Sequence, residues 1–300
     1  MSASALFLLS HGYVYLNSKV CTIGPSSDKE HSIGELVHNG MSVARLNFSH
    51  AGTDYTYPKS ILDKVRAAAG RHSQLATSTG TYVPPNVRAV LVDTKGPEIR
   101  TGPLPGDAPE LEIQTGATVE LHTKEDVVSE DPTAEIMKIS VDYTSIATTV
   151  AVGSQVLLDD GLITLQVEEI DPNGEFVVTT AQNSGPIKKN KGVNLPGATL
   201  DLPALTDKDK HDLEWACAVG ADYVAASFIR TPENVRSVVS YLDRCVALLN
   251  EKDDGRRLRP LVISKIESKE GVDNFDAILK ESDSIMVARG DLGVVRVRQG

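Results

Sequence analysis

The chain has 300 residues, of which 41% are hydrophobic and 24% are charged, as is ordinary for a folded globular protein. Its 30 basic side chains against 41 acidic ones give a formal net charge of -11, which argues against general affinity for nucleic acid or for an anionic membrane. An acidic chain that acts on an acidic substrate must gather positive charge locally. The candidates for this charge are Arg45, Arg100, Lys191 and Lys265.

The cysteines and the N-terminus bear on the compartment. Cys21, Cys217 and Cys245 are widely spaced, odd in number and without a CxxC pattern, which disfavours structural disulfides and a zinc site and favours a reducing compartment, by default the cytoplasm. Residues 1–17 form a divergent tail whose apolar run, ALFLL, lacks a preceding basic region and a cleavage pattern. The tail predicts neither a membrane span nor a secretory signal, although targeting to an organelle stays open.

Residues 18–96 alternate apolar runs with helical patterns. The runs VCTIGP, SVARLNFS and AVLVDT predict strands. SSDKEHSIGELVHNG predicts a helix with a serine N-cap that ends at Gly40, and SILDKVRAAAG predicts a second helix. The polar segment HSQLATSTGTYVPPN predicts a loop. This alternation indicates the first part of a parallel α/β domain.

Residues 97–202 have a different pattern, with short alternating strands and no convincing helix. ATVELHT, SQVLLDD, LITLQVEEI and EFVVTTAQN predict strands, with turns at DPNG and DDG. Gly and Pro occur at both junctions, in KGPEIRTGP and VNLPGATLDLP, as suits a hinge. We therefore expect an inserted all-β domain that can act as a lid.

Strand and helix alternate again over residues 203–294. Thr206 and Asp209 form a capping-box pattern, and Thr231 precedes Pro232 at the first position of another helix. DYVAASFI, LVISKIE and SIMVARG predict strands, which brings the total to six where a closed barrel has eight. The expected fold class is α/β, an incomplete TIM-type (β/α) barrel with an inserted all-β lid.

Charged residues stand at the ends of two neighbouring predicted strands. Lys265 and Glu267 share one face of LVISKIES, so a buried salt bridge between them is one interpretation. Burying two charges costs several kcal/mol unless other groups satisfy them, and a phosphate at Lys265 with a divalent cation at Glu267 would do so. Asp291 follows Glu267 by 24 residues, a span that fits one helical crossover, so we expect it at the end of the next strand. Two such carboxylates match the usual ligands of Mg²⁺.

Two other strand ends carry polar groups. Arg45, Asn47 and Ser49 share one face of SVARLNFSH, which predicts an inward polar group; the alternative is an edge strand with a solvated polar face. Asp93 and Thr94 end AVLVDT, although DTKGPE alone is equally typical of a turn.

Two loops of the insertion also contain charge. DDG around Asp160 is, by itself, typical of a turn, and the basic run KKNKGVNLPG around Lys191 is typical of a solvated loop. The basic run would also suit an anion that approaches from the insertion.

Nine motifs occur together and in order: CTIGPSS, GMSVARLNFSH, DTKGPEIRTG, DDGLITL, KGVNLPG, LPALTDKD, ASFIRT, ISKIES and MVARGDLGV. In this set the chain resembles pyruvate kinase from about Ser18 to Val294. The resemblance implies a barrel interrupted by a mobile β lid. It also implies transfer of the phosphoryl group of phosphoenolpyruvate to ADP, giving pyruvate and ATP, the final step of glycolysis.

The resemblance also implies residue roles. Lys265 is similar to the lysine that stabilises the transferred phosphoryl group, and Arg45 to the arginine that binds the substrate phosphate. Glu267 and Asp291 match the ligands of Mg²⁺ or Mn²⁺, and Gly290 belongs to the stretch that holds the substrate carboxylate. The implied K⁺ site comprises Asn47, Ser49, Asp93 and Thr94, and Glu98 resembles the glutamate of K⁺-dependent members. The implied nucleotide contacts are Pro25, His50, Arg100, Asp160 and Lys191, the last two arriving with the lid.

The chain departs from the family pattern in four places. Ser268 replaces an asparagine, Ala51 precedes Gly52 in a loop, and the segment 73–86 is longer than usual. Residues 295–300 after Val294 read as a non-family tail, so we expect this polypeptide to lack the last two barrel strands and the C-terminal domain expected for the family homotetramer.

An open sheet leaves two unpaired edges, so we expect this polypeptide alone to be poorly soluble or inactive. A truncated, non-catalytic fragment or pseudoenzyme is thus an alternative function. Another Mg²⁺-dependent barrel that acts on phosphoenolpyruvate or pyruvate, such as a mutase or aldolase, gives no reason for the DDG and KGVNLPG motifs.

Overall fold

A computed structural model of the chain describes residues 18–68, 88–104, 108–124, 127, 135–252 and 256–296. The described residues group into two compact units. The first is drawn from the segments Met1–Pro97, Pro203–Ile266 and Asn274–Val287, and the second from Glu98–Leu202, Glu267–Asp273 and Ala288–Gly300. Among the helices in the described ranges, none combines the length and the apolar character needed to cross a bilayer.

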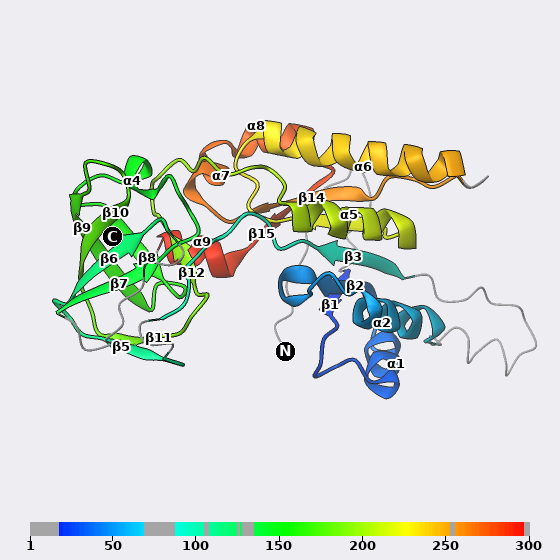
Figure 1. Cartoon of the computed structure of the whole chain (residues 1–300). Coiled ribbons are helices and arrows are strands. Elements are labelled where there is room, and N and C mark those ends of the chain that lie inside the picture. The colour runs from blue at the N-terminus through cyan, green and yellow to red at the C-terminus, as the bar shows by residue number, and fades with distance from the viewer. Residues whose placement is uncertain are drawn as a thin grey trace, which may run out of the picture. The chain divides into compact units, whose positions relative to one another are not determined.

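The first unit is built on a six-stranded parallel sheet whose strands lie side by side in chain order (Figure 1). Its strands are β1 (Lys19–Thr22), β2 (Met41–Asn47), β3 (Ala89–Asp93), β13 (Tyr223–Ala226), β14 (Leu261–Ile266) and β15 (Ser284–Val287). All six correspond to the strands predicted from the sequence. Because neighbouring strands are parallel, their carboxyl ends share one edge of the sheet, and this edge determines where the polar strand ends meet.

Helices connect the strands of this sheet. They are α1 (Glu30–His38), the 3₁₀ turn η1 (Phe48–His50), α2 (Thr56–Ala67), α5 (Asp207–Val219), α6 (Pro232–Lys252) and α8 (Phe275–Glu281). The helices α5 and α6 pack side by side, and α6 also packs on β14 and α8 (Figure 1).

Two of the three predicted helix caps are present. Thr206 and Asp209 form the capping box of α5, and the Thr231 hydroxyl accepts a hydrogen bond from the Asn234 backbone at the start of α6. The predicted serine cap of α1 is wrong, because Lys29 occupies the N-cap without a side-chain hydrogen bond. The Ser27 hydroxyl is used instead in the preceding turn, where it accepts a hydrogen bond from the Gly24 backbone.

Aspartates close the amino ends of neighbouring strands. The Asp222 carboxylate accepts a 2.7 Å hydrogen bond from the Val90 backbone of β3, and the Asp283 carboxylate accepts a 2.8 Å bond from the Val262 backbone of β14. Each aspartate directly precedes a strand, β13 or β15. They satisfy strand N–H groups that the parallel ladder leaves unpaired at its amino end.

One face of the sheet carries an apolar layer, defined as Val20, Val43, Leu91, Ala225 and Ile263. These five residues come one each from β1, β2, β3, β13 and β14, and all are buried. Since side chains alternate along a strand, the residue two positions further on each strand points to the same face. The apolar layer thus indicates which residues come next on this face.

The second unit contains a seven-stranded sheet, in the order β4-β12-β8-β9-β10-β6-β7, and a two-stranded sheet, β11-β5. The first-sheet strands are β4 (Ile99–Arg100), β6 (Thr118–His122), β7 (Ile136–Ser140), β8 (Gln155–Leu158), β9 (Ile163–Ile170), β10 (Phe176–Ala181) and β12 (Gly192–Asn194). The second sheet comprises β5 (Leu111–Ile113) and β11 (Gly185–Ile187). The unit also includes α7 (Lys269–Asp273) and α9 (Arg289–Arg296), which contact each other.

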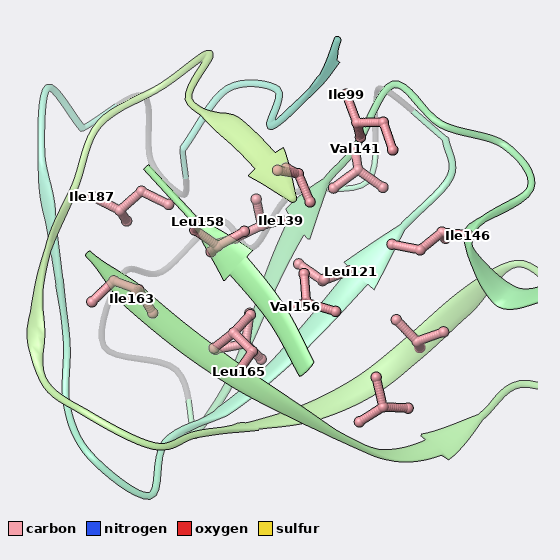
Figure 2. Packing of buried hydrophobic residues seen from close by; sticks show 14 of the residues in the cluster. Ile99, Leu121, Ile139, Val141, Ile146, Val156, Leu158, Ile163, Leu165 and Ile187 are labelled. Carbon is pink, nitrogen blue, oxygen red and sulfur yellow. The ribbon is translucent and has the colours of Figure 1, made fainter. Parts of the chain in front are cut away.

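The strands of the second unit enclose a core of their own. Figure 2 shows aliphatic side chains from several strands converging there, among them Leu121, Ile139, Val156, Leu158 and Leu165, all fully buried. The four strands predicted here are present as β6, β8, β9 and β10. The sequence did not predict α4 (Ile146–Thr149), a single helical turn whose Ile146 side chain fills the same core (Figure 2).

Candidate active site

A polar layer lies directly beyond the apolar layer, two residues further along the same five strands. It comprises Thr22, Arg45, Asp93, Ser227 and Lys265. Thr22 and Asp93 end their strands, Arg45 and Lys265 stand within the last three residues of theirs, and Ser227 directly follows β13. On this face of the sheet, the side chains therefore change from aliphatic to polar over two residues at the carboxyl edge.

The members of the polar layer form one connected hydrogen-bonded set. Arg45 donates from Nη1 to the Thr22 hydroxyl at 2.7 Å and from Nε to Asp93 Oδ2 at 2.7 Å. Lys265 Nζ lies 3.1 Å from the other oxygen, Oδ1, of Asp93 and donates to the Ser227 hydroxyl at 2.7 Å. Residues separated by up to 172 positions of sequence, Asp93 and Lys265, are thus brought into contact by the parallel sheet.

Asp93 is the centre of this set. Its carboxylate has no exposed surface, and each of its oxygens faces a cation, Arg45 on one side and Lys265 on the other. Arg45 and Lys265 keep 22% and 11% of their side-chain surface exposed. One negative charge between two positive charges gives the polar layer a net charge of +1. Such a layer can attract and orient an anion.

The loop after β3 is joined to the loop after β13. The Thr94 backbone N–H donates to the Ala225 carbonyl at 3.0 Å, and the Ser227 hydroxyl donates to the Thr94 carbonyl at 2.7 Å. Gly96, with φ of +75°, packs so closely that an added Cβ would lie 2.7 Å from Ser227 Cβ. This contact requires glycine, both for the backbone conformation and for space.

Asn47 and Ser49 stand at the end of β2 and in η1. The Asn47 side-chain oxygen accepts a 3.1 Å hydrogen bond from the Ser49 backbone, which caps η1 and fixes both residues locally. Arg45, Asn47 and Ser49 are partly exposed, whereas Ala44, Leu46 and Phe48 between them are buried, and β2 lies between β1 and β3, so it is not an edge strand. Pro25 is exposed in the turn after β1, and the His50 side chain lies outside the part of the chain that the structure describes.

In the second unit, Arg100 is held by several groups. Its Nε donates to Glu98 at 2.8 Å, its Nη2 also binds Glu98, and its Nη1 donates to the Asn190 carbonyl at 2.7 Å. The predicted site residues Glu98 and Arg100 therefore form an ion pair with each other. Arg100 is oriented beside the segment that contains Lys191.

The DDG turn and the basic run also meet in the second unit. Lys191 Nζ lies 3.0 Å from Asp159, and the Asp159 backbone donates to the Gly192 carbonyl at 2.9 Å. Asp159 and Asp160 both adopt positive φ angles, +50° and +55°, a strained conformation that functional turns often contain. Burial raises the pKa of Asp160, as do the nearby Asp291 and Asp159 carboxylates, whereas Lys191 and Arg100 oppose the shift.

Glu267 and Asp291 follow the last two described strands. Glu267 directly follows β14 and is buried. The expectation that Asp291 ends a strand is wrong, because β15 stops at Val287 and Asp291 is in the first turn of α9, after Gly290. Within the described residues, no group of three or more His, Cys, Asp or Glu side chains is placed to hold a metal ion. A cation here would need oxygens from another source as well as from carboxylates.

Two members of the polar layer, Thr22 and Ser227, were not predicted from the sequence. Both are small hydroxyl residues after apolar runs, VC and VAA, where hydroxyl groups are common for purely structural reasons. Their positions could have indicated them, because each lies two residues beyond an apolar strand residue, as Asp93 and Lys265 do. Recognising it required aligning all the strand ends as one edge.

The comparisons with known proteins agree on one family. The family model described as pyruvate kinase, barrel domain, matches residues 16–298. Two similar curated relatives are pyruvate kinases of Bacillus licheniformis, 40% identical, and of Staphylococcus saprophyticus, 41% identical, each over 275 residues and 92% of this chain. The crystal structure of a pyruvate kinase from Cryptosporidium parvum is similar with a TM-score of 0.77 and 36% identity, covering 93% of this chain and 52% of that one.

The chain spans 42% of the length of each of the two curated relatives. The matched region contains the six parallel strands, the polar layer and the β-rich unit between their two halves. The similarity therefore extends over nearly the whole chain and is not confined to one motif. The chain belongs to the pyruvate kinase family.

Proposed function

We propose that the protein transfers the phosphoryl group of phosphoenolpyruvate to ADP, giving pyruvate and ATP. The observation that supports this most is the polar layer, in which Arg45 and Lys265 flank the buried Asp93 carboxylate at the carboxyl edge of the sheet. Phosphoryl transfer needs little covalent help from a protein, but it needs positive charge held in fixed positions around the moving group. Two cations fixed by one buried anion meet that need.

In this proposal the two cations have different roles. The Arg45 guanidinium binds the phosphate of phosphoenolpyruvate with the donors that Asp93 and Thr22 leave unused, since a guanidinium has five. The Lys265 ammonium neutralises charge on the phosphoryl group during transfer. The contacts that both make within the polar layer fix them before the substrate arrives, which reduces the reorganisation needed during the reaction.

The carboxylates also suit the cations on which this family generally depends. Glu267 and Asp291 provide hard oxygen ligands, and Mg²⁺ or Mn²⁺ typically binds through one or two carboxylates plus substrate phosphates. When bound, the divalent ion would neutralise charge on the phosphoryl oxygens, and the backbone at Gly290 would hold the substrate carboxylate. For K⁺, the proposed oxygen donors are Asn47, Ser49, Asp93 and Thr94, with Glu98 setting the dependence on K⁺.

We assign nucleotide binding to residues of both units, namely Pro25, His50, Arg100, Asp160 and Lys191. The corresponding domain division is a barrel of residues 18–96 and 203–294 and a lid of residues 97–202. A lid that closes over the substrates would exclude water and so favour transfer to ADP over hydrolysis. We further infer a cytoplasmic protein and, for the full-length family, a homotetramer.

The test is a coupled assay of pyruvate formation from phosphoenolpyruvate and ADP with Mg²⁺ and K⁺ present. Lys265→Met should lower kcat by about 10³-fold or more, because it removes the charge closest to the transferred group. Lys59→Met, which removes an exposed lysine from α2, is the matched control and should leave kcat unchanged. Turnover retained in Lys265→Met would remove Lys265 from the transfer step.

A second measurement tests the alternative, a non-catalytic pyruvate kinase fragment. Binding of phosphoenolpyruvate, measured by calorimetry, would persist without any turnover in the unsubstituted protein. Loss of binding in Arg45→Met would then show that the polar layer binds the ligand even where no transfer follows.

A further inference from the structure

The hydroxyl of Ser227 joins two groups to which the proposed function gives separate roles. It accepts a 2.7 Å hydrogen bond from Lys265 Nζ and lies 2.7 Å from the Thr94 carbonyl oxygen. Its distance to Asp93 Oδ1 is longer, 3.4 Å. A hydroxyl has one hydrogen to donate, and the shorter contact assigns it to Thr94. The lone pairs of the oxygen then face Lys265.

The backbone around Ser227 is fixed on several sides. The Ser227 N–H donates to the Thr94 hydroxyl at 3.3 Å, so the two residues exchange hydrogen bonds. Gly96 packs against Ser227 Cβ, and the next residue, Phe228, has a φ of +55°, which a phenylalanine rarely adopts. Such strain persists only where the surrounding contacts determine the conformation. The position of the Ser227 hydroxyl is therefore set by the fold and does not depend on Lys265.

Asp93 alone would not give Lys265 a single position. A lysine is a compact charge on a flexible four-carbon chain, and its attraction to a carboxylate depends only weakly on direction. Arg45 also binds the same carboxylate. A second, directional acceptor at 2.7 Å restricts the ammonium to the place where both contacts can be made.

We propose that Ser227 is a positioning residue that fixes the Lys265 ammonium beside Asp93 and ties it through Thr94 to the end of β3. The inference deepens the proposed function, on which it rests for its catalytic meaning. The same hydroxyl contacts the group proposed to meet the phosphoryl and the carbonyl of a residue proposed to bind K⁺. A displacement of the Lys265 ammonium or of the Thr94 carbonyl would thereby affect the other group through the Ser227 hydroxyl oxygen.

The first test measures the position of Lys265 without requiring turnover. An amine-reactive reagent is applied to the native protein, and labelling of each lysine is followed by peptide mass spectrometry. Ser227→Val should raise the labelling rate of Lys265 by about 10-fold, the scale of one hydrogen bond to a charged group. Ser227→Thr has almost the same shape as Ser227→Val but keeps the hydroxyl, so it should stay within about twofold of the unsubstituted protein.

Ser264→Ala is the matched control. Ser264 directly precedes Lys265 on β14, is equally buried, and bonds with Ser282 at 2.6 Å on the opposite face. Removal of the Ser264 hydroxyl should leave the labelling rate of Lys265 unchanged. The labelling rate of Lys208 should be the same in every variant. Equal Lys265 labelling in the Val and Thr variants, or a rise in Ser264→Ala as large as in Ser227→Val, would overturn the proposal.

The activity assay then separates this inference from the proposed function. If the protein turns over, Ser227→Val should lower kcat by about 10- to 100-fold with a small change in KM, and Ser227→Thr should restore most of it. If no variant turns over, including the unsubstituted protein, the proposed function fails. The labelling result still decides whether Ser227 positions Lys265.

Discussion

The ammonium nitrogen of Lys265 lies 3.1 Å from a carboxylate oxygen of Asp93, a side chain without exposed surface. Arg45 binds the other oxygen of the same carboxylate. One buried carboxylate thus contacts two cations in the polar layer. Its removal should leave two positive charges facing each other at the edge of the barrel.

Asp93→Asn should therefore lower the free energy of unfolding by about 3 kcal/mol or more, as breaking a buried ion pair usually does. Urea unfolding at neutral pH measures this. Asp63→Asn breaks an exposed pair with Lys59 on α2 and should cost no more than about 0.5 kcal/mol. Similar unfolding midpoints for the two variants would show that the polar layer does not depend on Asp93 for its charge balance.

Gly96→Ala should be more costly than the same substitution at another left-handed glycine. Gly96 has φ of +75°, and an alanine Cβ there would meet Ser227 Cβ at 2.7 Å. Gly220, at the end of α5, has φ of +67° but no atom within 4 Å of the same position. Both variants carry the left-handed backbone cost of about 1 kcal/mol, and Gly96→Ala adds an overpacking cost of about 1–3 kcal/mol.

The comparison of the two alanine variants in thermal unfolding isolates the contact with Ser227. A lower Tm for Gly96→Ala than for Gly220→Ala is the expected result. Equal Tm values would mean that the backbone conformation, and not the contact with Ser227, determines the need for glycine at position 96.

Sequence patterns predicted the strands of the parallel sheet and three of the five residues of the polar layer for a clear physical reason. A buried parallel strand is a short apolar run, and a charge at its end is visible without knowledge of the neighbouring strands, as at Asp93 and Lys265. Arg45 was visible through alternation along a single strand. These signals are local, so one sequence is sufficient to find them.

The partners within the layer were not predictable in this way. The contacts of Lys265 with Asp93 and Ser227, which lie on or directly after other strands, were not predicted. Which strand ends meet depends on register and sheet order, and neither is encoded in a local pattern. Asp291 was misplaced for a related reason, since the chain enters α9 before reaching it.

Gly102 and Ser140 in the second unit should show strong coupling. An alanine Cβ at position 102 would lie 2.1 Å from the Ser140 hydroxyl oxygen but 3.4 Å from Ser140 Cβ. That buried hydroxyl has no hydrogen-bond partner among the described residues, so Ser140→Ala alone should cost little. Gly102→Ala alone should cost about 1–3 kcal/mol through overpacking.

The double variant Gly102→Ala/Ser140→Ala should recover most of that loss. A double-mutant cycle from urea unfolding should thus give a coupling energy of about 1 kcal/mol or more. Additive effects would contradict the close contact between the two positions.

Asp212 gives a pH-dependent prediction. Its buried carboxylate accepts hydrogen bonds from the Tyr55 hydroxyl at 2.9 Å and from Lys208 at 2.6 Å. Burial raises the pKa of Asp212 above its ordinary value, and the bonds from Lys208 and Tyr55 oppose this shift. In the pH range just above the ordinary aspartate value, the folded protein therefore holds a proton that the unfolded chain has lost. The contribution of Asp212 to stability should fall as pH rises through that range.

Urea unfolding between pH 4 and pH 7 tests the sign of this effect with two variants. In Asp212→Asn the titrating group is absent, so this part of the fall in stability with pH should disappear. Tyr55→Phe removes a bond that favours the ionised carboxylate, so the pKa should rise further and the fall with pH should extend over a wider range. The same pH dependence in Asp212→Asn as in the unsubstituted protein would mean that another group causes it. If stability instead fell over a narrower pH range in Tyr55→Phe, the substitution would have lowered the pKa of Asp212. The tyrosine hydroxyl would then stabilise the protonated carboxyl and not the ionised one.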